Sequence, residues 1–397
     1  MTDERPLPLD GVVVLDLGQV YQGPYAGFLM AMAGARVIKI EPLGGETLRA
    51  RGPSLPYAML NGGKETVALD LKSSPGVAAL HRLAAAADVV LTNFAPGVPE
   101  RLGIGWEDLR AVNPRLIYGY GTGFGLDDPE PGDAVPAMDI TVQAHMGIMS
   151  VTGHPGGAPV KAGVPFIDFL SGTHLYAALV TALYERERTG VGRVVEVAMV
   201  DAAYPTLASA AGSWLQSGSV PRTGNKHTAL AVAPYDAYLC TDGYVALIAA
   251  TNRHWRSVLA VIGRDDLIDD PRYRQMIDRA GRMGEVDALV GDWTRTRSRA
   301  EVAEALQAAH VPAAVVRNVE EVMADPALVR RGAVAWIDHP ELGRVPVHHS
   351  ALRWRGSPLK PLEPSRPVGA DTGAVLTELA GYTADELADI PPPRPPA

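Results

Sequence analysis

Short apolar runs alternate with helical patterns along the first half of the chain. The apolar runs, rich in Val, Ile and Leu, are Gly11–Leu17, Arg36–Glu41, Thr66–Leu71, Asp88–Phe94 and Leu116–Tyr120. The helical patterns between them lie at Pro24–Ala33, Pro75–Ala87 and Trp106–Val112. Strand–helix alternation with strands this apolar predicts a parallel sheet whose two faces are both covered by helices. In such a sheet, ligands bind at the loops beyond the carboxyl ends of the strands.

The middle of the chain holds the longest apolar helical segment, residues 168–187. It is apolar almost all round as far as Glu185, which predicts a buried core helix. Arg193–Val200 then has the pattern of a strand, and Asp201–Trp214 has that of a further helix.

The pattern changes near residue 220. Pro234–Ala250 holds two strand-like runs around Thr241-Asp242-Gly243, which is a hairpin signal. Helical patterns follow at Trp255–Ile262, Met283–Thr294, Ser298–Ala309 and Asp371–Ala380. We therefore predict an α/β fold with a large Rossmann-like parallel-sheet domain over residues 1–224, completed by residues 331–397, and a smaller α+β domain over residues 225–330. The proline-rich tail, residues 391–397, is expected to be extended or disordered.

Composition and charge narrow the range of partners. The chain has 397 residues and a formal net charge of −9, which argues against nucleic acid or an anionic membrane as a partner. An anionic ligand stays possible, because helix N-termini and local Lys or Arg side chains hold phosphates. The single cysteine, Cys240, excludes an intramolecular disulfide framework and fits a reducing compartment. With no apolar leader and no run near the ~20 apolar residues that cross a bilayer, we expect a cytoplasmic protein.

Several common catalytic motifs are missing from the sequence. It has no G-x-S-x-G elbow, and Gly62-Gly63-Lys64-Glu65 lacks the Ser or Thr of a phosphate-binding loop. The alternating glycines from Gly119 to Gly125 fit no register of G-x-G-x-x-G. The histidines never take a zinc-binding spacing, so a protein-bound metal is not expected.

Motifs in a fixed order along most of the chain resemble the type III CoA-transferase family, which includes formyl-CoA transferase, carnitine CoA-transferase and α-methylacyl-CoA racemase. They are densest in the first 205 residues and include VLDLG, GARVIKIEP, ALDLK, TNFAPG, MDITVQA and RERTGVGRVVEVAMVDA. APYDAYLCTDGYVALIA and VPAAVV follow in the second domain.

The resemblance makes Asp168 the catalytic nucleophile. On sequence alone an Asp before a long helix is most simply an N-cap, and the two roles are compatible, because the helix dipole and amide donors hold a carboxylate ionised. By analogy with the family, Asp168 attacks an acyl-CoA to give an aspartyl anhydride. This becomes an aspartyl-CoA thioester, from which a carboxylic acid acceptor takes the CoA. CoA and acyl-CoA are therefore substrates, and the resemblance implies no tightly bound cofactor.

The resemblance also implies a set of CoA contacts. Val20, Tyr21 and Gln22 occupy the loop after the first strand, where backbone contacts near the thioester are expected. Arg101 is expected at a phosphate and Phe94 near the adenine. The other expected contacts are Lys39, Lys64, Asn93, Met138 and Met199. Each also has a purely structural interpretation: a solvated strand-end lysine, a core methionine, or a loop residue with a satisfied side chain.

The family contains two chemistries, and the sequence favours transfer. Racemisation needs acid/base groups on both faces of the substrate. The racemase His-Asp pair falls here on Met138-Asp139, and the second-domain glutamate falls near Asn252, so neither Met138 nor Asn252 can carry the proton. A racemase-type proton transfer and a non-catalytic CoA-binding protein are the alternatives, and the presence of Asp168 argues against the second.

Two further expectations come from the resemblance. The glycine-rich loop of formyl-CoA transferase is reduced to one glycine in Gly224-Asn225-Lys226-His227-Thr228, which argues against formate–oxalate exchange and for a different, less polar acid. The family also implies an intertwined homodimer of two interlocked rings. Residues 187–225 and 331–397 would carry the crossings, and both chains would build each active site.

Overall fold

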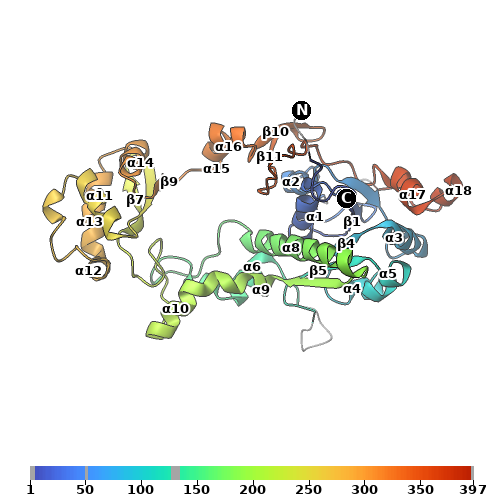
Figure 1. The fold of residues 1–397 in the computed structure, drawn as a ribbon, viewed down its shortest axis with the longest axis horizontal. Helices are drawn as coiled ribbons and strands as arrows, with labels where there is room; N and C mark the ends of the chain where they lie inside the picture. The colour runs from blue at the N-terminus through green and yellow to red at the C-terminus, as the bar shows by residue number, and fades with distance from the viewer. Residues whose placement is uncertain (1–4, 50–51, 127–134, 395–397) are drawn as a thin grey trace. The chain divides into compact units, whose positions relative to one another are not determined.

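The computed structural model describes residues 5–49, 52–126 and 135–394 (Figure 1). Its largest sheet has six strands, all parallel, in the order β3-β2-β1-β4-β5-β6. The strands are β1 (Val13–Asp16), β2 (Arg36–Glu41), β3 (Glu65–Ala68), β4 (Val89–Thr92), β5 (Ile117–Thr122) and β6 (Val194–Ala198). The predicted parallel sheet is thus confirmed. Its order reverses between β1 and β4, which places the loops after these two strands at the expected ligand-binding edge.

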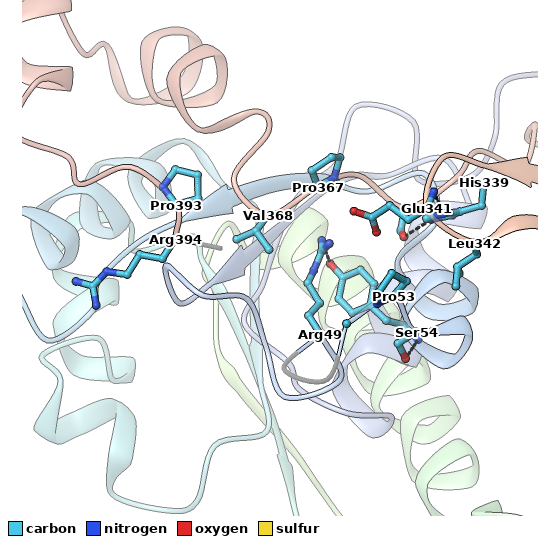
Figure 2. Close-up of a pocket in the computed structure, with 13 residues that line it drawn as sticks. Arg49, Pro53, Ser54, His339, Glu341, Leu342, Pro367, Val368, Pro393 and Arg394 are labelled. Carbon is cyan, nitrogen blue, oxygen red and sulfur yellow. Dashed lines mark hydrogen bonds between the residues drawn. The ribbon is translucent and has the colours of Figure 1, made fainter. Parts of the chain in front are cut away.

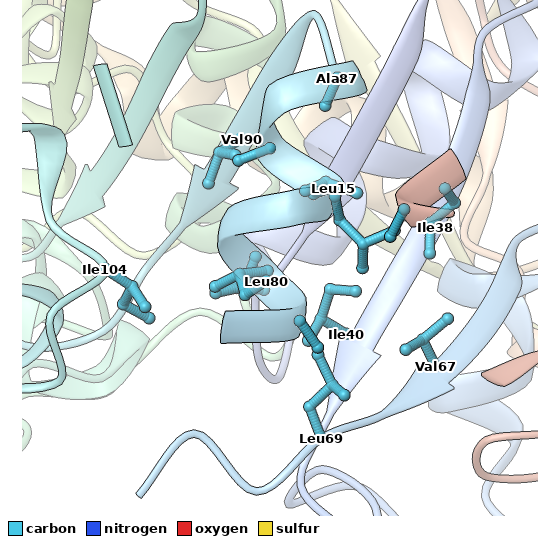
Figure 3. Packing of buried hydrophobic residues seen from close by; sticks show 14 of the residues in the cluster. Leu15, Ile38, Ile40, Val67, Leu69, Leu80, Ala87, Val90 and Ile104 are labelled. Carbon is cyan, nitrogen blue, oxygen red and sulfur yellow. The ribbon is translucent and has the colours of Figure 1, made fainter. Parts of the chain in front are cut away.

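Alternate residues of each strand enter two different hydrophobic cores. Leu15, Ile38 and Val90 pack in a core that includes α3 (Ser74–Ala86) and α17 (Thr372–Ala380), as Figure 3 shows for the strand residues and α3. Their neighbours in the strands pack on the other side, against α1 (Gln22–Met32) and α8 (Phe166–Thr189). Successive strand side chains point to opposite faces, so both faces of an apolar strand can be buried. Each fully buried aliphatic side chain contributes roughly 1.5–3 kcal/mol.

Helix α8 is half-buried, so the expectation of a helix buried all round is wrong. Leu175, Leu179 and Leu183 are buried on the sheet, whereas Tyr184 is 67% exposed. A single helix lying on a sheet covers only one stripe of its own surface, whatever the polarity of the opposite stripe. By length and composition α8 is apolar enough to cross a membrane, so the expectation that no run of the chain approaches this length is wrong. Its packing on β5 and β6 accounts for that apolar stripe as part of the core.

The chain divides into two compact units. The first comprises residues 1–142, 164–204 and 323–397, and the second comprises residues 143–163 and 205–322. The second unit contains an antiparallel sheet of β7 (Tyr235–Cys240), β8 (Gly243–Ile248) and β9 (Ala313–Val315). Residues of α11 (Asn252–Val261), α13 (Met283–Thr294) and α14 (Arg299–Ala308) pack on it to form a separate core.

Residues 143–163 and 205–224, which the sequence analysis assigned to the large domain, group here with the second unit. Long-range hydrogen bonds join these two segments. The Gly224 amide donates to the Gly153 carbonyl over 2.9 Å, and the Arg222 guanidinium donates to the carbonyls of Ser150 and Gly157.

The remaining elements connect these cores. They are α2 (Leu55–Asn61), α4 (Val98–Arg101), α5 (Trp106–Val112), α6 (Asp139–His145), α7 (Ile148–Val151), α9 (Met199–Ala203), η1 (Tyr204–Leu207), α10 (Ala208–Ser217), η2 (Asp265–Leu267), α12 (Met276–Ala280), α15 (Val319–Met323), α16 (Pro326–Arg331), β10 (Ala335–His339), β11 (Gly343–Val347) and α18 (Ala384–Leu387). The helix predicted over 201–214 is interrupted, because Pro205 has no amide hydrogen for a helical bond.

The proline-rich tail is extended as far as Arg394, whose amide donates to the Leu43 carbonyl over 2.7 Å. Pro395 and Pro396 lie outside the described residues.

Candidate active site

Asp168 lies in the first turn of α8, where a second carboxylate takes the amide donors. The N-cap position belongs to Pro165, so Asp168 is not the N-cap. The amides of Ile167 and Asp168 donate to Asp139 Oδ2 over 2.8 and 3.3 Å. Among the described residues, none donates a hydrogen bond to the Asp168 carboxylate. Asp139 therefore caps α8 and leaves the Asp168 oxygens available for chemistry.

Burial and the neighbouring charge of Asp139 raise the pKa of Asp168 to about 7. The expectation that amide donors keep this carboxylate firmly ionised is thus wrong, because those donors serve Asp139 instead. A carboxyl with a pKa near neutrality is a stronger base and nucleophile than an ordinary Asp, and is still ionised in a large fraction of molecules at pH 7. Such strongly shifted groups concentrate at functional sites.

Replacing Asp139 by Asn should lower the pKa of Asp168. The neutral amide removes the like charge, while its Oδ1 still accepts the Ile167 amide. A nucleophilic carboxylate must be ionised, so kcat/KM for the donor acyl-CoA rises with pH through the pKa of the free enzyme. We expect the midpoint of this acid limb, near 7 in the wild type, to fall by on the order of one unit. A midpoint that stays or moves upward would contradict the assignment. Asp139→Ala separates the charge effect of Asp139 from its role as a helix cap, because this variant removes the cap as well as the charge and should reduce stability.

The loop after β1 lies beside the start of α8. The rings of Tyr21 and Phe169 are 5.7 Å apart, and burial together with the charges of Asp168 and Glu46 raises the pKa of Tyr21. Gly172 permits this approach, because a Cβ there would lie 2.7 Å from the Gln22 carbonyl oxygen. The structure therefore brings the predicted loop and the predicted nucleophile together.

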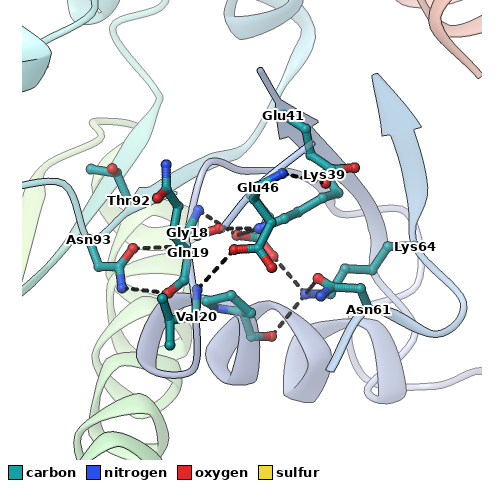
Figure 4. A network of polar contacts seen from close by, with 12 residues as sticks. Gly18, Gln19, Val20, Lys39, Glu41, Glu46, Asn61, Lys64, Thr92 and Asn93 are labelled. Carbon is teal, nitrogen blue, oxygen red and sulfur yellow. Dashed lines mark hydrogen bonds and ion pairs between the residues drawn. The ribbon is translucent and has the colours of Figure 1, made fainter. Parts of the chain in front are cut away.

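Three polar side chains fix the conformation of this loop through four hydrogen bonds (Figure 4). Asn93 Oδ1 accepts the Gln19 amide over 2.7 Å, and Asn93 Nδ2 donates to the Gln19 carbonyl over 2.9 Å. Asp16 Oδ1 accepts the Gly18 amide over 2.8 Å, and Glu46 Oε2 accepts the Val20 amide over 3.1 Å. Val20 has φ +63°, a strained conformation for a β-branched residue. Asn93 thus holds the loop, in addition to any contact with a ligand.

Lys39 and Lys64 are buried below this loop, so neither is the solvated strand-end lysine of the structural interpretation, and their predicted contact with CoA stays a prediction. Both side chains have 0% exposure. Lys64 Nζ lies 2.6 Å from Asp16 Oδ2, and Lys39 lies 3.8 Å from Asp16 Oδ1 and donates to the Gly18 carbonyl. Burial lowers the pKa of Lys64 to about 8, although Asp16 opposes the shift. Asp16 and backbone carbonyl oxygens already engage both ammonium groups, so these lysines support the loop from beneath.

The other predicted contacts lie in different environments. Gln22 begins α1 and is buried, and its Nε2 donates to the Val197 carbonyl at the end of β6 over 3.4 Å. Met199 follows β6 directly and is buried, whereas Met138, just before α6, is 56% exposed. Gln22 and Met199 therefore both lie at the carboxyl end of β6.

A cavity of about 410 Å³ opens at the carboxyl ends of the central strands. Gln19, Glu46 and Phe94 line it together with Lys72 and Arg394. A shallower hollow of about 560 Å³ shares Leu71, Lys72 and Leu102 with this cavity and adds Arg101. Lys72 and Arg101 form no ion pair with any residue in the described ranges. The adjoining hollows thus offer three cations without an ion pair among the described residues, Lys72, Arg101 and Arg394, together with the ring of Phe94.

Sequence reasoning missed Glu46, Lys72 and Arg394 as lining residues. Lys72 had a signal, because it ends the ALDLK motif four residues after β3 and so falls at the ligand-binding edge. Glu46 and Arg394 had none, since only the folded chain places residues this far apart in sequence around one cavity.

Several of the polar residues that line a second cavity, of about 280 Å³, already have partners (Figure 2). Arg49 donates to Glu41 Oε1 over 2.9 Å and to the Tyr57 hydroxyl over 2.5 Å. His339 Nε2 lies 3.0 Å from Ser365 Oγ. We assign no ligand to this cavity. In the described part of the chain, no group of three His, Cys, Asp or Glu side chains is placed to hold a metal ion.

Comparison with known proteins identifies the family. The model of CoA-transferase family III matches residues 9–372. The chain belongs to CoA-transferase family III. This confirms the resemblance and establishes the chain as a type III CoA-transferase, for which CoA thioesters and carboxylates are the substrates.

Relatives of this CoA-transferase agree along nearly its whole length. A succinate–glutarate CoA-transferase of Agrobacterium fabrum is 33% identical, over 96% of this chain and 98% of that protein. An acetyl-CoA:oxalate CoA-transferase of Acetobacter aceti is 35% identical, over 86% of this chain and 91% of that protein. The crystal structure of a CAIB/BAIF family protein from Brucella suis has a TM-score of 0.83 and 31% identity, and covers 94% of this chain and 100% of that one.

Proposed function

We propose that this CoA-transferase moves CoA from an acyl-CoA to a carboxylic acid through covalent intermediates on Asp168. The observation that carries the proposal is the position of Asp168. Its carboxylate accepts no hydrogen bond from a described residue, has a pKa of about 7, and lies at the start of α8 beside the loop after β1.

The reaction runs in balanced steps. An Asp168 oxygen attacks the thioester carbonyl carbon, the C–S bond breaks, and an aspartyl anhydride and CoA thiolate form. The thiolate attacks the aspartyl carbon of the anhydride, which releases the first acid as its carboxylate and leaves an aspartyl-CoA thioester. The acceptor carboxylate attacks this thioester and expels the thiolate. Attack of the thiolate on the acceptor carbon of the new anhydride gives the new acyl-CoA and restores Asp168.

The adjoining hollows are the proposed site for the nucleotide end of CoA. We propose that Lys72 and Arg101 contact its phosphates and that Phe94 lies against the adenine. Val20, Tyr21 and Gln22 would then lie near the thioester. The two remaining predicted contacts, Met138 and Met199, would lie beside the pantetheine arm. Asn93, Lys39 and Lys64 would act indirectly, by fixing the loop.

The acceptor is proposed to be a small mono- or dicarboxylate. The relatives named above act on succinate and glutarate, or on oxalate with acetyl-CoA. Carboxylates of this class therefore form the first panel of acceptors to assay.

We also propose a cytoplasmic homodimer with interlocked chains. Large apolar side chains on α8 and α10 support a partner chain, because Tyr184, Trp214 and Leu215 are 67%, 59% and 77% exposed. Light scattering with size-exclusion chromatography tests this assembly, and a monomer at micromolar concentration would contradict it.

The mass of the intact protein tests the covalent mechanism. Wild type and Asp168→Ala are incubated with a panel of acyl-CoAs and trapped with hydroxylamine or borohydride. We expect a modification that maps to Asp168 in the wild type and is absent from the variant. If no donor labels Asp168 while deuterium exchanges at the α-carbon of an acyl-CoA, the transferase mechanism is wrong and proton transfer replaces it. CoA binding without turnover or label would indicate the non-catalytic alternative.

A further inference from the structure

Glu46 has one carboxylate oxygen without a partner. Its side chain is buried, with the residue 2% exposed, and Oε2 accepts the amide of Val20. Oε1 is also buried but accepts no hydrogen bond from any described residue. An orphaned carboxylate oxygen in a protein interior is costly, and each one calls for an explanation.

The same residue lines the 410 Å³ cavity at the ends of the central strands. Burial raises the pKa of Glu46, although Lys39 and the amides of Val20 and Leu48 act in the opposite direction. The Leu48 amide lies near the carboxylate but forms no hydrogen bond with Oε1. Glu41, the other glutamate of this cavity, differs because Arg49 and Tyr57 both donate to its carboxylate. Glu46 is thus the glutamate of this cavity with spare capacity to accept a hydrogen bond.

We propose that Glu46 accepts a hydrogen bond from an N–H group of bound CoA and so links occupancy of the cavity to the strained turn at Val20. The inference rests on the proposed function, because it takes CoA as the ligand. CoA carries such donors on the two amides of its pantetheine arm and on the adenine amino group. A donor in the cavity would satisfy Oε1, while Oε2 keeps the Val20 amide in place beside Asp168.

The variant Glu46→Gln tests this geometry with little change in shape. Its carbonyl oxygen is needed by the Val20 amide, so its NH₂ group takes the place of Oε1 and faces the CoA donor with another donor. We expect KM for the acyl-CoA to rise about tenfold, while kcat changes much less. Glu341→Gln, which removes an exposed carboxylate that lines the other cavity, is the matched control and should leave both constants unchanged.

Truncated substrates identify the donor. If a pantetheine amide is the donor, acyl-pantetheine suffers the same rise in KM as acyl-CoA. If the adenine amine is the donor, only acyl-CoA does. A purely structural role of Glu46 would instead lower kcat and the thermal midpoint alike, whichever substrate is used. An unchanged KM for both donors in a folded Glu46→Gln protein would overturn the proposal.

Binding measurements separate this inference from the proposed function. Calorimetry with free CoA needs no turnover, so weaker binding by Glu46→Gln supports the contact even if Asp168 proves not to form a covalent intermediate. In the wild type, CoA should slow amide hydrogen exchange in a peptide that contains Val20. Unchanged exchange there, or no binding of CoA at all, would overturn the link.

Discussion

Replacing Asp168 by Asn is expected to lower kcat by at least roughly 10³-fold, because an amide cannot form the anhydride. The substitution keeps the shape of the side chain, so the affinity for CoA should change little. Steady-state kinetics with the best donor–acceptor pair, together with calorimetry for CoA, measures both quantities. A variant that keeps more than about a tenth of the wild-type kcat would show that Asp168 is not the nucleophile.

The pH dependence of stability shows whether the Asp168→Asn protein is correctly folded, because this dependence follows from the pKa of Asp168. Burial and Asp139 raise this pKa to about 7, so the folded protein binds the proton more tightly than the unfolded chain does. Keeping Asp168 in its buried site therefore costs stability progressively as pH rises from the unfolded pKa, roughly 4, to the folded pKa of about 7, and this cost is absent only below the unfolded pKa. Asp168→Asn should accordingly raise the thermal midpoint at pH 8 and raise it by clearly less at pH 5, where only part of the cost is present. A lower midpoint at pH 8 would attribute the lost activity to misfolding.

The sheet could be predicted from sequence because its signal is local. Val14 and Leu15 are adjacent and both buried, one in each core, and such unbroken apolar runs are typical of a strand covered on two sides. The candidate nucleophile, Asp168, is likewise indicated by its place in an ordered series of motifs. The loop at the switch point followed from the topology that the alternation implied.

The electrostatics of the site depended on tertiary contacts that no local pattern contains. Asp139 and Asp168 are 29 residues apart, yet the first caps the helix of the second and raises its pKa. In the sequence, Lys39 in GARVIKIEP and Lys64 before ALDLK look like solvated strand-end residues. Their burial on one aspartate requires β1, β2 and β3 to lie side by side in the sheet.

The shape of the β1 loop therefore depends on Asp16, and replacement of Asp16 should have the largest effect on stability. Burial alone raises the pKa of Asp16, but the charges of Lys39 and Lys64 outweigh burial and leave the pKa below its usual value. Asp16→Asn would leave two ammonium groups, both with 0% exposure, without their counter-charge. We expect the free energy of unfolding in urea to fall by about 3–5 kcal/mol.

A matched pair of variants separates this burial effect from charge in general. Glu107 pairs with Arg110 over 3.1 Å on the surface, with 75% and 53% exposure, so Glu107→Gln should have a barely measurable effect. Adding Lys64→Met to Asp16→Asn removes one of the two stranded ammonium groups and should recover part of the lost stability. Because the pKa of Asp16 is lowered in the folded protein, its contribution is present above the unfolded pKa and is lost as pH falls through the folded pKa. If Asp16→Asn and Glu107→Gln lower the free energy of unfolding equally near neutral pH, the buried ion pairs of Asp16 with Lys39 and Lys64 do not stabilise the loop.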